Sequence, residues 1–484
     1  MSWNKKTFGL LAGPLTFLAI YFFAHPAGLS KEALAVLAVT SWVAIWWITE
    51  AIQIEVTALL PVVLFPLSGG LSLTDTCASY GHKFIFLFIG GFILAIAIEK
   101  WNLHRRIALS IINLVGTNLN YIILGFMVST AFLSMWISNT ATAVMMLPIG
   151  VAIIKQMGKG DDSKQFGKAL MLSIAYAASI GGVATLIGTP PNIILAGIIE
   201  KTYSVELSFT QWFKIGFPIS IVLLFICWKY LTTFAFSFKN TQMEGGRSYI
   251  KEQLRSLGKM GFEESLVLIV FVVTALLWIC RSVVLKLYIP ALDDTIIAIL
   301  AALVLFMLPA KEKGKQLLEW KDAVKLPWGV LMLFGGGIAI AVAFDQSGLA
   351  GWIATQLSSL QGVHLFMLLL LLVVSVNFLT EITSNLATAS VLLPVLAPLA
   401  LAMNIHPYVV MVGCTLAASC AFMLPVATPP NAIVFGSGYL TISDMMRAGI
   451  WLNVISILLL TLAVYFLLPL LWDIDIHSFP NAFK

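Results

Sequence analysis

Long apolar runs recur along the whole chain. The sequence has 484 residues, of which 60% are hydrophobic and only 11% are charged, whereas soluble globular proteins carry about 25% charged residues. Runs of roughly 18 or more apolar residues are long enough to cross a bilayer as helices. In lipid they must be helical, because their backbone polar groups can only be satisfied internally. The sequence therefore predicts an all-α polytopic membrane protein, without the alternating segments typical of a membrane β-barrel.

One polar stretch, residues 236–262, divides the chain into halves of similar size. The first apolar run follows MSWNKK and lacks a small-residue cleavage site, so we expect a membrane helix and not a removed signal peptide. The expected regions are an N-terminal helix (1–30), a first repeat (31–235), a cytoplasmic linker (236–262), a second repeat (263–472) and a C-terminal tail (473–484).

Clusters of Lys and Arg set the expected orientation, because loops rich in these residues stay in the cytoplasm. All clusters fall on one side if two segments, 120–157 and 363–402, each enter the membrane and return as a re-entrant hairpin. This interpretation gives about eleven crossings. The N-terminus is then cytoplasmic, the first hairpin opens from the cytoplasm and the second from the exterior. Polar residues in the middle of both segments favour re-entry, since non-helical turns at bilayer depth occur only inside protein or beside water.

Two near-identical strings lie in the middle of these segments. SNTATAVMMLP at 138–148 returns as SNLATASVLLP at 384–394, 246 positions later. Each is followed by a TPPN string, inside the apolar segments 168–200 and 407–440. The matched order and the odd number of crossings between the copies predict an inverted repeat. The binding site of such a fold lies at the repeat interface and is built from discontinuous helices.

The paired strings offer ligands for a small cation and for an anion. Pro-Pro removes two backbone donors and disfavours helix at the preceding residue, so each TPPN string should break its helix. A break frees carbonyl oxygens, which suit a hard cation, and N–H groups at a positive helix end, which suit an anion. None of the four strings contains Lys or Arg. Bound cations would therefore have to balance a buried dianion, which couples the two binding events.

Other classes of protein fit the sequence less well. The five cysteines and six histidines show no spacing typical of metal ligands. The sequence also shows no nucleophile paired with a base, which an enzyme active site would need. The net charge of +5 fits cytoplasmic loops and not a nucleic-acid partner. Small polar residues in membrane helices can serve helix packing alone. Two Ser-Asn strings and two TPPN strings in the same order in both halves favour a binding site instead. Glu50 and Glu99 lie near the ends of apolar runs, where water can solvate them. Glu381 precedes Ser384 by three residues, and a role for it in proton transfer stays open.

These strings, with WWITEAIQIEVTALLPVVLFPL at 46–67, resemble the divalent anion:sodium symporter family of the INDY type. The resemblance covers nearly the whole chain. It implies import of Krebs-cycle di- or tricarboxylates, or of sulfate in some branches, usually driven by sodium. It also implies a homodimer in lipid, whose protomers each have a scaffold domain and a transport domain that moves as an elevator.

The resemblance further implies two sodium sites and a substrate site between them. The residues carried over by motif are Ser134, Ser138, Asn139 and the backbone of Gly188 for the first Na⁺; Thr380, Ser384, Asn385 and the backbone of Ala427 for the second; and Asn139, Thr140, Thr189, Ser384, Asn385, Thr428 and Pro429 for the substrate.

Two positions depart from the family pattern, and the first bears on the substrate. The second motif reads SNL, so Leu386 removes a hydroxyl that bacterial dicarboxylate members often have. The early signature TEAIP reads TEAIQ here, with Gln53 in place of proline and Glu55 following. We expect that stretch to lie outside the site and to alter only the entry of a helix.

The favoured function is sodium-coupled symport of a C4-dicarboxylate such as succinate, malate or fumarate across a bacterial inner membrane. An obligate exchanger of the same fold, and citrate or sulfate as substrate, stay open. A channel or an intramembrane enzyme is less consistent with the paired polar strings.

Overall fold

The computed structural model describes residues 5–114, 118–157, 160–236, 238, 246–358 and 362–483. Within these ranges the chain forms helices joined by short connections, and an isolated β-bridge pairs Pro309 with Gln316. Nine of the described helices are long and apolar enough to cross a membrane, and shorter apolar helices accompany them. The all-α polytopic membrane fold predicted from the sequence is therefore confirmed.

The helices of the first half begin where small polar residues meet the apolar runs. Ser30, Ser72 and Asn118 each accept a backbone N–H of the first helical turn and so cap α2, α5 and α8. The elements of this half are α1 (Lys5–Phe23), α2 (Lys31–Thr49), α3 (Ile54–Thr57), α4 (Leu60–Ser68), α5 (Leu73–Ser79), α6 (Lys83–Lys100), α7 (Leu103–Leu114), α8 (Leu119–Ser134), α9 (Asn139–Gln156), α10 (Asp161–Val183), α11 (Pro190–Tyr203), α12 (Phe209–Lys229) and the π-helical turn η1 (Tyr230–Ala235).

The second half follows the polar stretch 236–262, of which residues 237 and 239–245 lie outside the described residues. That stretch contains a helix, α13, where the sequence predicts only a linker. The elements are α13 (Gly246–Ser256), α14 (Phe262–Cys280), η2 (Arg281–Leu285), α15 (Lys286–Tyr288), α16 (Asp294–Met307), α17 (Trp320–Ala323), α18 (Trp328–Gln346), α19 (Leu349–Leu357), α20 (Leu365–Thr380), α21 (Asn385–Ala402), α22 (Pro407–Ala418), α23 (Pro429–Phe435), α24 (Ile442–Leu462), η4 (Ala463–Leu467), α25 (Leu468–Trp472) and η5 (Asn481–Phe483).

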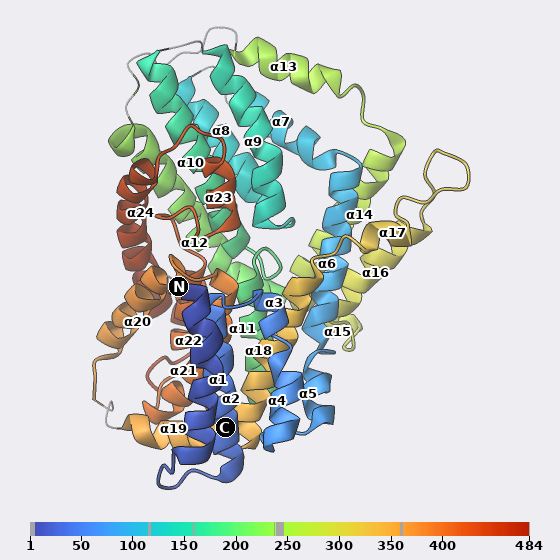
Figure 1. The fold of residues 1–484 in the computed structure, drawn as a ribbon. Helices are drawn as coiled ribbons and strands as arrows, with labels where there is room; N and C mark the ends of the chain where they lie inside the picture. The colour runs from blue at the N-terminus through green and yellow to red at the C-terminus, as the bar shows by residue number, and fades with distance from the viewer. Residues whose placement is uncertain are drawn as a thin grey trace.

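The helices of the two halves correspond in chain order. The pair α6–α7 matches α18–α19, α8–α9 matches α20–α21, α10–α11 matches α22–α23, and α12 matches α24. In Figure 1, α8 and α9 lie in the upper part of the view and α21 and α22 in the lower part. The two units therefore approach the centre of the molecule from opposite ends, as an inverted repeat requires.

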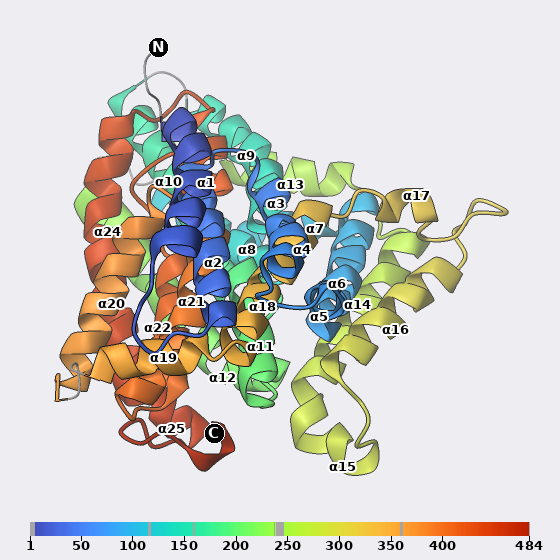
Figure 2. The same cartoon turned by 60° about the horizontal axis from the view of Figure 1, so that its bottom comes forward.

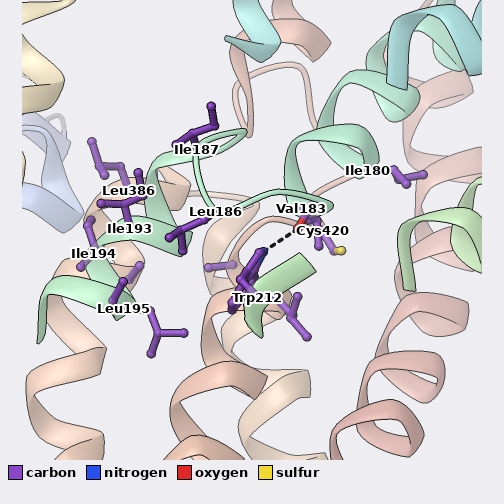
Figure 3. Close-up of a cluster of buried hydrophobic side chains, with 14 of the residues drawn as sticks. Ile180, Val183, Leu186, Ile187, Ile193, Ile194, Leu195, Trp212, Leu386 and Cys420 are labelled. Atoms are coloured by element: carbon purple, nitrogen blue, oxygen red, sulfur yellow. Dashed lines mark hydrogen bonds between the residues drawn. The ribbon is translucent and has the colours of Figure 1, made fainter. Parts of the chain in front are cut away.

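The core is built around α10, which is almost entirely buried and packs against α8, α9, α12 and α23. Gly181 permits this approach, because a Cβ there would lie 2.3 Å from the carbonyl oxygen of Ala131 on α8. Figure 3 shows the buried cluster near the end of α10, where Trp212 Nε1 donates a hydrogen bond of 2.9 Å to the Val183 carbonyl. This packing fixes the point at which α10 stops.

One side of the molecule is formed by α6, α14 and α16, which pack together. Figure 2 shows α14, α15 and α16 set apart from α20, α22 and α24. The outer faces of α14 and α16 expose Ile269, Val272, Leu276, Leu300 and Leu303. Helices that are apolar on their outer as well as their inner face suit a lipid surrounding. The division into scaffold and moving domains stays a prediction.

Candidate ion and substrate site

The first Ser-Asn string forms a turn between two helices. The helix α8 ends at Ser134, and α9 begins at Asn139 with Ser138 as its cap, whose hydroxyl accepts the Ala141 N–H at 3.2 Å. The Ser134 hydroxyl lies 2.6 Å from the amide oxygen of Asn139 and 2.7 Å from the carbonyl oxygen of Ala178. One hydroxyl proton faces two acceptors here, so the cluster has more oxygen lone pairs than protons.

The second string repeats this arrangement. The helix α20 ends at Thr380, and Ser384 caps α21 by accepting the Ala387 N–H at 3.1 Å. The Thr380 hydroxyl lies 2.8 Å from the amide oxygen of Asn385 and 3.0 Å from the Ala418 carbonyl oxygen. A small hard cation prefers such sets of hydroxyl, amide and carbonyl oxygens.

The two TPPN strings break their helices as the sequence predicts. The first break separates α10 from α11 at residues 184–189, and the second separates α22 from α23 at 419–428. The side-chain amide of the asparagine in each string donates hydrogen bonds to backbone carbonyls at the break. The Asn192 amide donates to the carbonyls of Gly182 (3.3 Å) and Thr185 (2.8 Å).

Asn431 does the same in the second half, donating to the carbonyls of Ala421 (3.2 Å) and Leu424 (3.0 Å). Backbone carbonyls that a broken helix would leave without partners are thereby satisfied. The asparagine of each TPPN string thus holds its helix break together, a role that no sequence pattern indicates.

One pocket of about 500 Å³ lies between the two turns and the two breaks. The first residues of α9, α11, α21 and α23 all line it, so the positive ends of four helices surround the space. The backbone N–H groups come from α9 and α21, because α11 and α23 begin with Pro-Pro. No Lys, Arg or His is found among the described residues that line it. An anion in this pocket would be held by helix ends, polar side chains and any cations beside it.

The structure brings every residue of the predicted site to this pocket or directly behind it. Ser134 and Thr380 do not line it; both are fully buried and reach it through Asn139 and Asn385. The predicted residues that line it are Ser138, Asn139, Thr140, Gly188, Thr189, Ser384, Asn385, Ala427, Thr428 and Pro429.

Two glycines allow the close contacts of the first turn. A Cβ on Gly182 would lie 2.5 Å from the Asn139 amide oxygen and 3.1 Å from the Gly188 carbonyl oxygen. A Cβ on Gly188 would in turn lie 2.5 Å from the Gly182 carbonyl oxygen. The space over Gly182 is therefore bounded by two of the oxygens expected around the first sodium ion, which fits the predicted donor set.

Glu381 has a defined structural task. Its carboxylate is 3% exposed. It accepts the backbone N–H groups of Phe422 (2.7 Å), Met423 (2.9 Å) and Leu424 (3.0 Å), and the side-chain amide of Asn453 (2.7 Å). The second turn is thereby bonded to the second break. The sequence showed this acid next to the motif but could not show its four donors.

Both departures from the family pattern lie at or next to the pocket. The TEAIQ residues do not line the pocket, but Glu55, two residues after Gln53, does. The short helix α3, which follows Gln53, carries Glu55 to the pocket wall. Leu386 also lines the pocket and is 8% exposed, in the buried cluster of Figure 3 that includes Ile187 and Ile193.

The sequence model of the family described as the sodium:sulfate symporter transmembrane region matches residues 4–472. The chain belongs to this family. It is 49% identical over 479 residues to the sodium-dependent dicarboxylate transporter SdcS of Staphylococcus saprophyticus, covering 97% of this chain and 92% of the relative. It is 48% identical over 481 residues to SdcS of Staphylococcus aureus, with the same coverage. The resemblance inferred from the motifs is confirmed, and the family is one of transporters, not enzymes.

Solved structures with low sequence identity share the fold. MtrF of Neisseria gonorrhoeae, described as one of a class of antimetabolite efflux pumps, superimposes with a TM-score of 0.56 at 12% identity and covers 96% of both chains. The YdaH transporter of Alcanivorax borkumensis gives a TM-score of 0.55 at 13% identity, covering 84% of this chain and 88% of its own. At these identities the likeness concerns the architecture alone.

Proposed function

We propose that this protein is a secondary transporter that carries C4-dicarboxylates such as succinate, malate or fumarate together with sodium ions across a bacterial cytoplasmic membrane. The observation that carries the proposal is the pairing of two oxygen clusters, around Ser134 and Thr380, on either side of one pocket surrounded by helix N-termini. Relatives of nearly equal length, at 48 and 49% identity, are named sodium-dependent dicarboxylate transporters.

Each sodium ion would be held by the oxygens of one turn and one break. The first set is Ser134, Ser138, Asn139 and the carbonyl of Gly188; the second is Thr380, Ser384, Asn385 and the carbonyl of Ala427. The carboxylates of the substrate would bind the Ser-Asn tips, with Thr140, Thr189, Thr428 and Pro429 lining the remainder. Since no basic side chain among the described lining residues compensates a dianion, sodium must bind for the substrate to bind well.

Transport would follow an elevator movement in a homodimer, with the N-terminus in the cytoplasm. The paired turns and breaks would move as one body against α2, α4, α6, α14, α16 and α18. Disulfide trapping tests this in a variant without the five native cysteines. Cysteine pairs between the tips of α9 or α21 and the helices α4 or α6 should trap two states at different depths. Crosslinks at a single depth contradict the elevator.

Uptake of labelled succinate into proteoliposomes tests the function. An inward sodium gradient should drive accumulation, and Asn139→Ala and Asn385→Ala should each abolish it. Asn481→Ala, an exposed position near the C-terminus, is the matched control and should retain uptake. Uptake that ignores sodium but needs internal dicarboxylate would identify an exchanger. Uptake of sulfate in place of succinate would move the substrate to the inorganic anion.

A further inference from the structure

The pocket has a second wall that the Ser-Asn and TPPN strings do not form. It comes from α3, α6 and the start of α18, and its residues are Ile54, Glu55, Phe88, Phe92, Pro327, Val330 and Leu333. All of these are apolar except Glu55. The strings therefore contribute polar groups and helix N-termini to the lining, whereas α3, α6 and α18 contribute apolar surface with a single carboxylate.

The side chain of Glu55 packs directly against Gly329, and only glycine at that position leaves room for it. A Cβ on Gly329 would lie 2.3 Å from Glu55 Cγ and 3.1 Å from its Cδ. The glutamate stem therefore lies directly on the first turn of α18, where any larger residue would displace it. Gly329 and Glu55 are 274 positions apart in the sequence, and their contact fixes the position of the carboxylate on the pocket wall.

The carboxylate of Glu55 is left without a counter-charge. Among the described residues no ion pair or hydrogen bond reaches it, and no Lys, Arg or His lines the pocket. The proposed sodium ligands belong to the Ser-Asn turns and the TPPN breaks, and Glu55 belongs to α3. The pocket thus has two electrically different ends, one suited to anions and one that opposes them.

We propose that Glu55 is a specificity-determining residue that admits dicarboxylates and rejects tricarboxylates. This inference rests on the proposed function. Two carboxylates fit at the tips, where helix ends and sodium stabilise them. The third carboxylate of a citrate-like anion has to face the α3 wall, where it meets Glu55. Two like charges several ångströms apart in a partly hydrated pocket oppose binding by a factor on the order of ten.

Competition by citrate against labelled succinate uptake tests the proposal, at pH 7.5 and saturating sodium. Glu55→Gln keeps the size of the side chain and removes the charge. We expect the inhibition constant of citrate to fall about tenfold, while the KM of succinate falls by a smaller factor. Glu55→Lys should shift the ratio further in the same direction. Glu32→Gln, an exposed glutamate on α2 outside the pocket, should leave both constants unchanged.

The proposal is overturned if Glu55→Gln leaves the ratio of the citrate inhibition constant to the succinate KM unchanged, whether or not the two constants change by a common factor. Thermal shifts of the purified variants with succinate and with citrate give the same ratio from binding alone. The proposal therefore remains testable if no uptake is seen. Wild-type protein without sodium-driven succinate uptake contradicts the proposed function instead, whatever the citrate ratio shows.

Discussion

The two halves of the site form the same arrangement with different supports. In each, a hydroxyl at the end of a hairpin helix contacts the asparagine of the next helix and a carbonyl of the broken helix. In the first half the break fits because Gly182 and Gly188 leave room. In the second half Ala421 and Ala427 occupy the corresponding positions, and the longer break is held by Glu381.

The difference teaches that duplicated chemistry does not require duplicated packing. The position that corresponds to Glu381 in the first half is Met135, whose carbonyl accepts a hydrogen bond of 2.6 Å from the Thr185 hydroxyl. One break is thus positioned by close backbone approach and the other by a buried carboxylate. Substitutions that respect this difference should affect the two halves unequally.

The largest effect is expected from Gly188→Ala. Its new Cβ would lie 2.5 Å from a backbone oxygen of Gly182, so the backbone around the first sodium site has to move. We expect sodium-driven succinate uptake to fall by a factor on the order of 100, with normal amounts of protein in the membrane. Ala427→Gly, the matched change in the second half, should retain most uptake. Equal losses in both variants contradict the comparison.

A loss almost as large is expected from Glu381→Ala. Removing the carboxylate leaves the N–H groups of Met423 and Leu424 and the Asn453 amide without an acceptor, whereas the Phe422 N–H keeps Asn453 Oδ1 at 3.2 Å. The cost is roughly 3 kcal/mol or more. The apparent melting temperature in detergent and the uptake rate should both fall, and Glu381→Gln should recover only part. Met135→Leu at the corresponding position should leave both values near wild type. Normal sodium-driven uptake by Glu381→Ala would show that the hydrogen bonds of Glu381 to the second break are not needed for transport.

A smaller and symmetrical effect is expected where the halves agree. Ser134→Ala and Thr380→Val each remove one hydroxyl from an oxygen cluster, and each should raise the half-saturating sodium concentration about tenfold. Ser129→Ala, another buried hydroxyl of α8 that donates to the Gly125 carbonyl, serves as the control. If only one of the two variants changes the sodium requirement, the clusters are not equivalent sodium sites.

Leu386→Thr makes the two strings more alike and should have a modest effect. The hydroxyl offers one more donor to a carboxylate, but the position is 8% exposed and packs in an apolar cluster. We expect the succinate KM to change within about threefold and the free energy of unfolding to fall by about 1–2 kcal/mol. A tenfold lower KM would show that Leu386 is a principal determinant of substrate affinity.

The smallest effect on transport is expected at His406, just before α22. Burial lowers its pKa to about 4, against a small opposing effect of Asp475. The unfolded chain takes up the proton near pH 6.5 and the folded chain only near pH 4, so stability present above pH 6.5 is lost as the pH falls through that window. The apparent melting temperature should drop by about 2 °C or more between pH 7 and 5. His406→Asn should remove that part of the pH dependence.

The sequence predicted the elements that repeat. The Ser-Asn and TPPN strings locate the hairpin turns and the breaks, because proline and helix-capping serines act locally. The sequence could not show which surfaces meet across the chain. Tertiary packing creates both the contact of Glu55 with Gly329 and the hydrogen bonds from four donors to Glu381. No sequence pattern near either glutamate predicts these partners. The sequence therefore predicts a peripheral position for Glu55, although this residue lines the pocket.

The absence of charged side chains on the polar wall, as far as the described residues show, has an electrical consequence. If that wall moves, the Glu381 carboxylate behind it returns to its starting position in every cycle, so the net charge moved per cycle is that of the cargo. Two sodium ions with one dianion give a silent cycle that the membrane voltage neither drives nor opposes. A third cation would move one positive charge per turnover, so the ratio of current to flux counts the coupling ions directly.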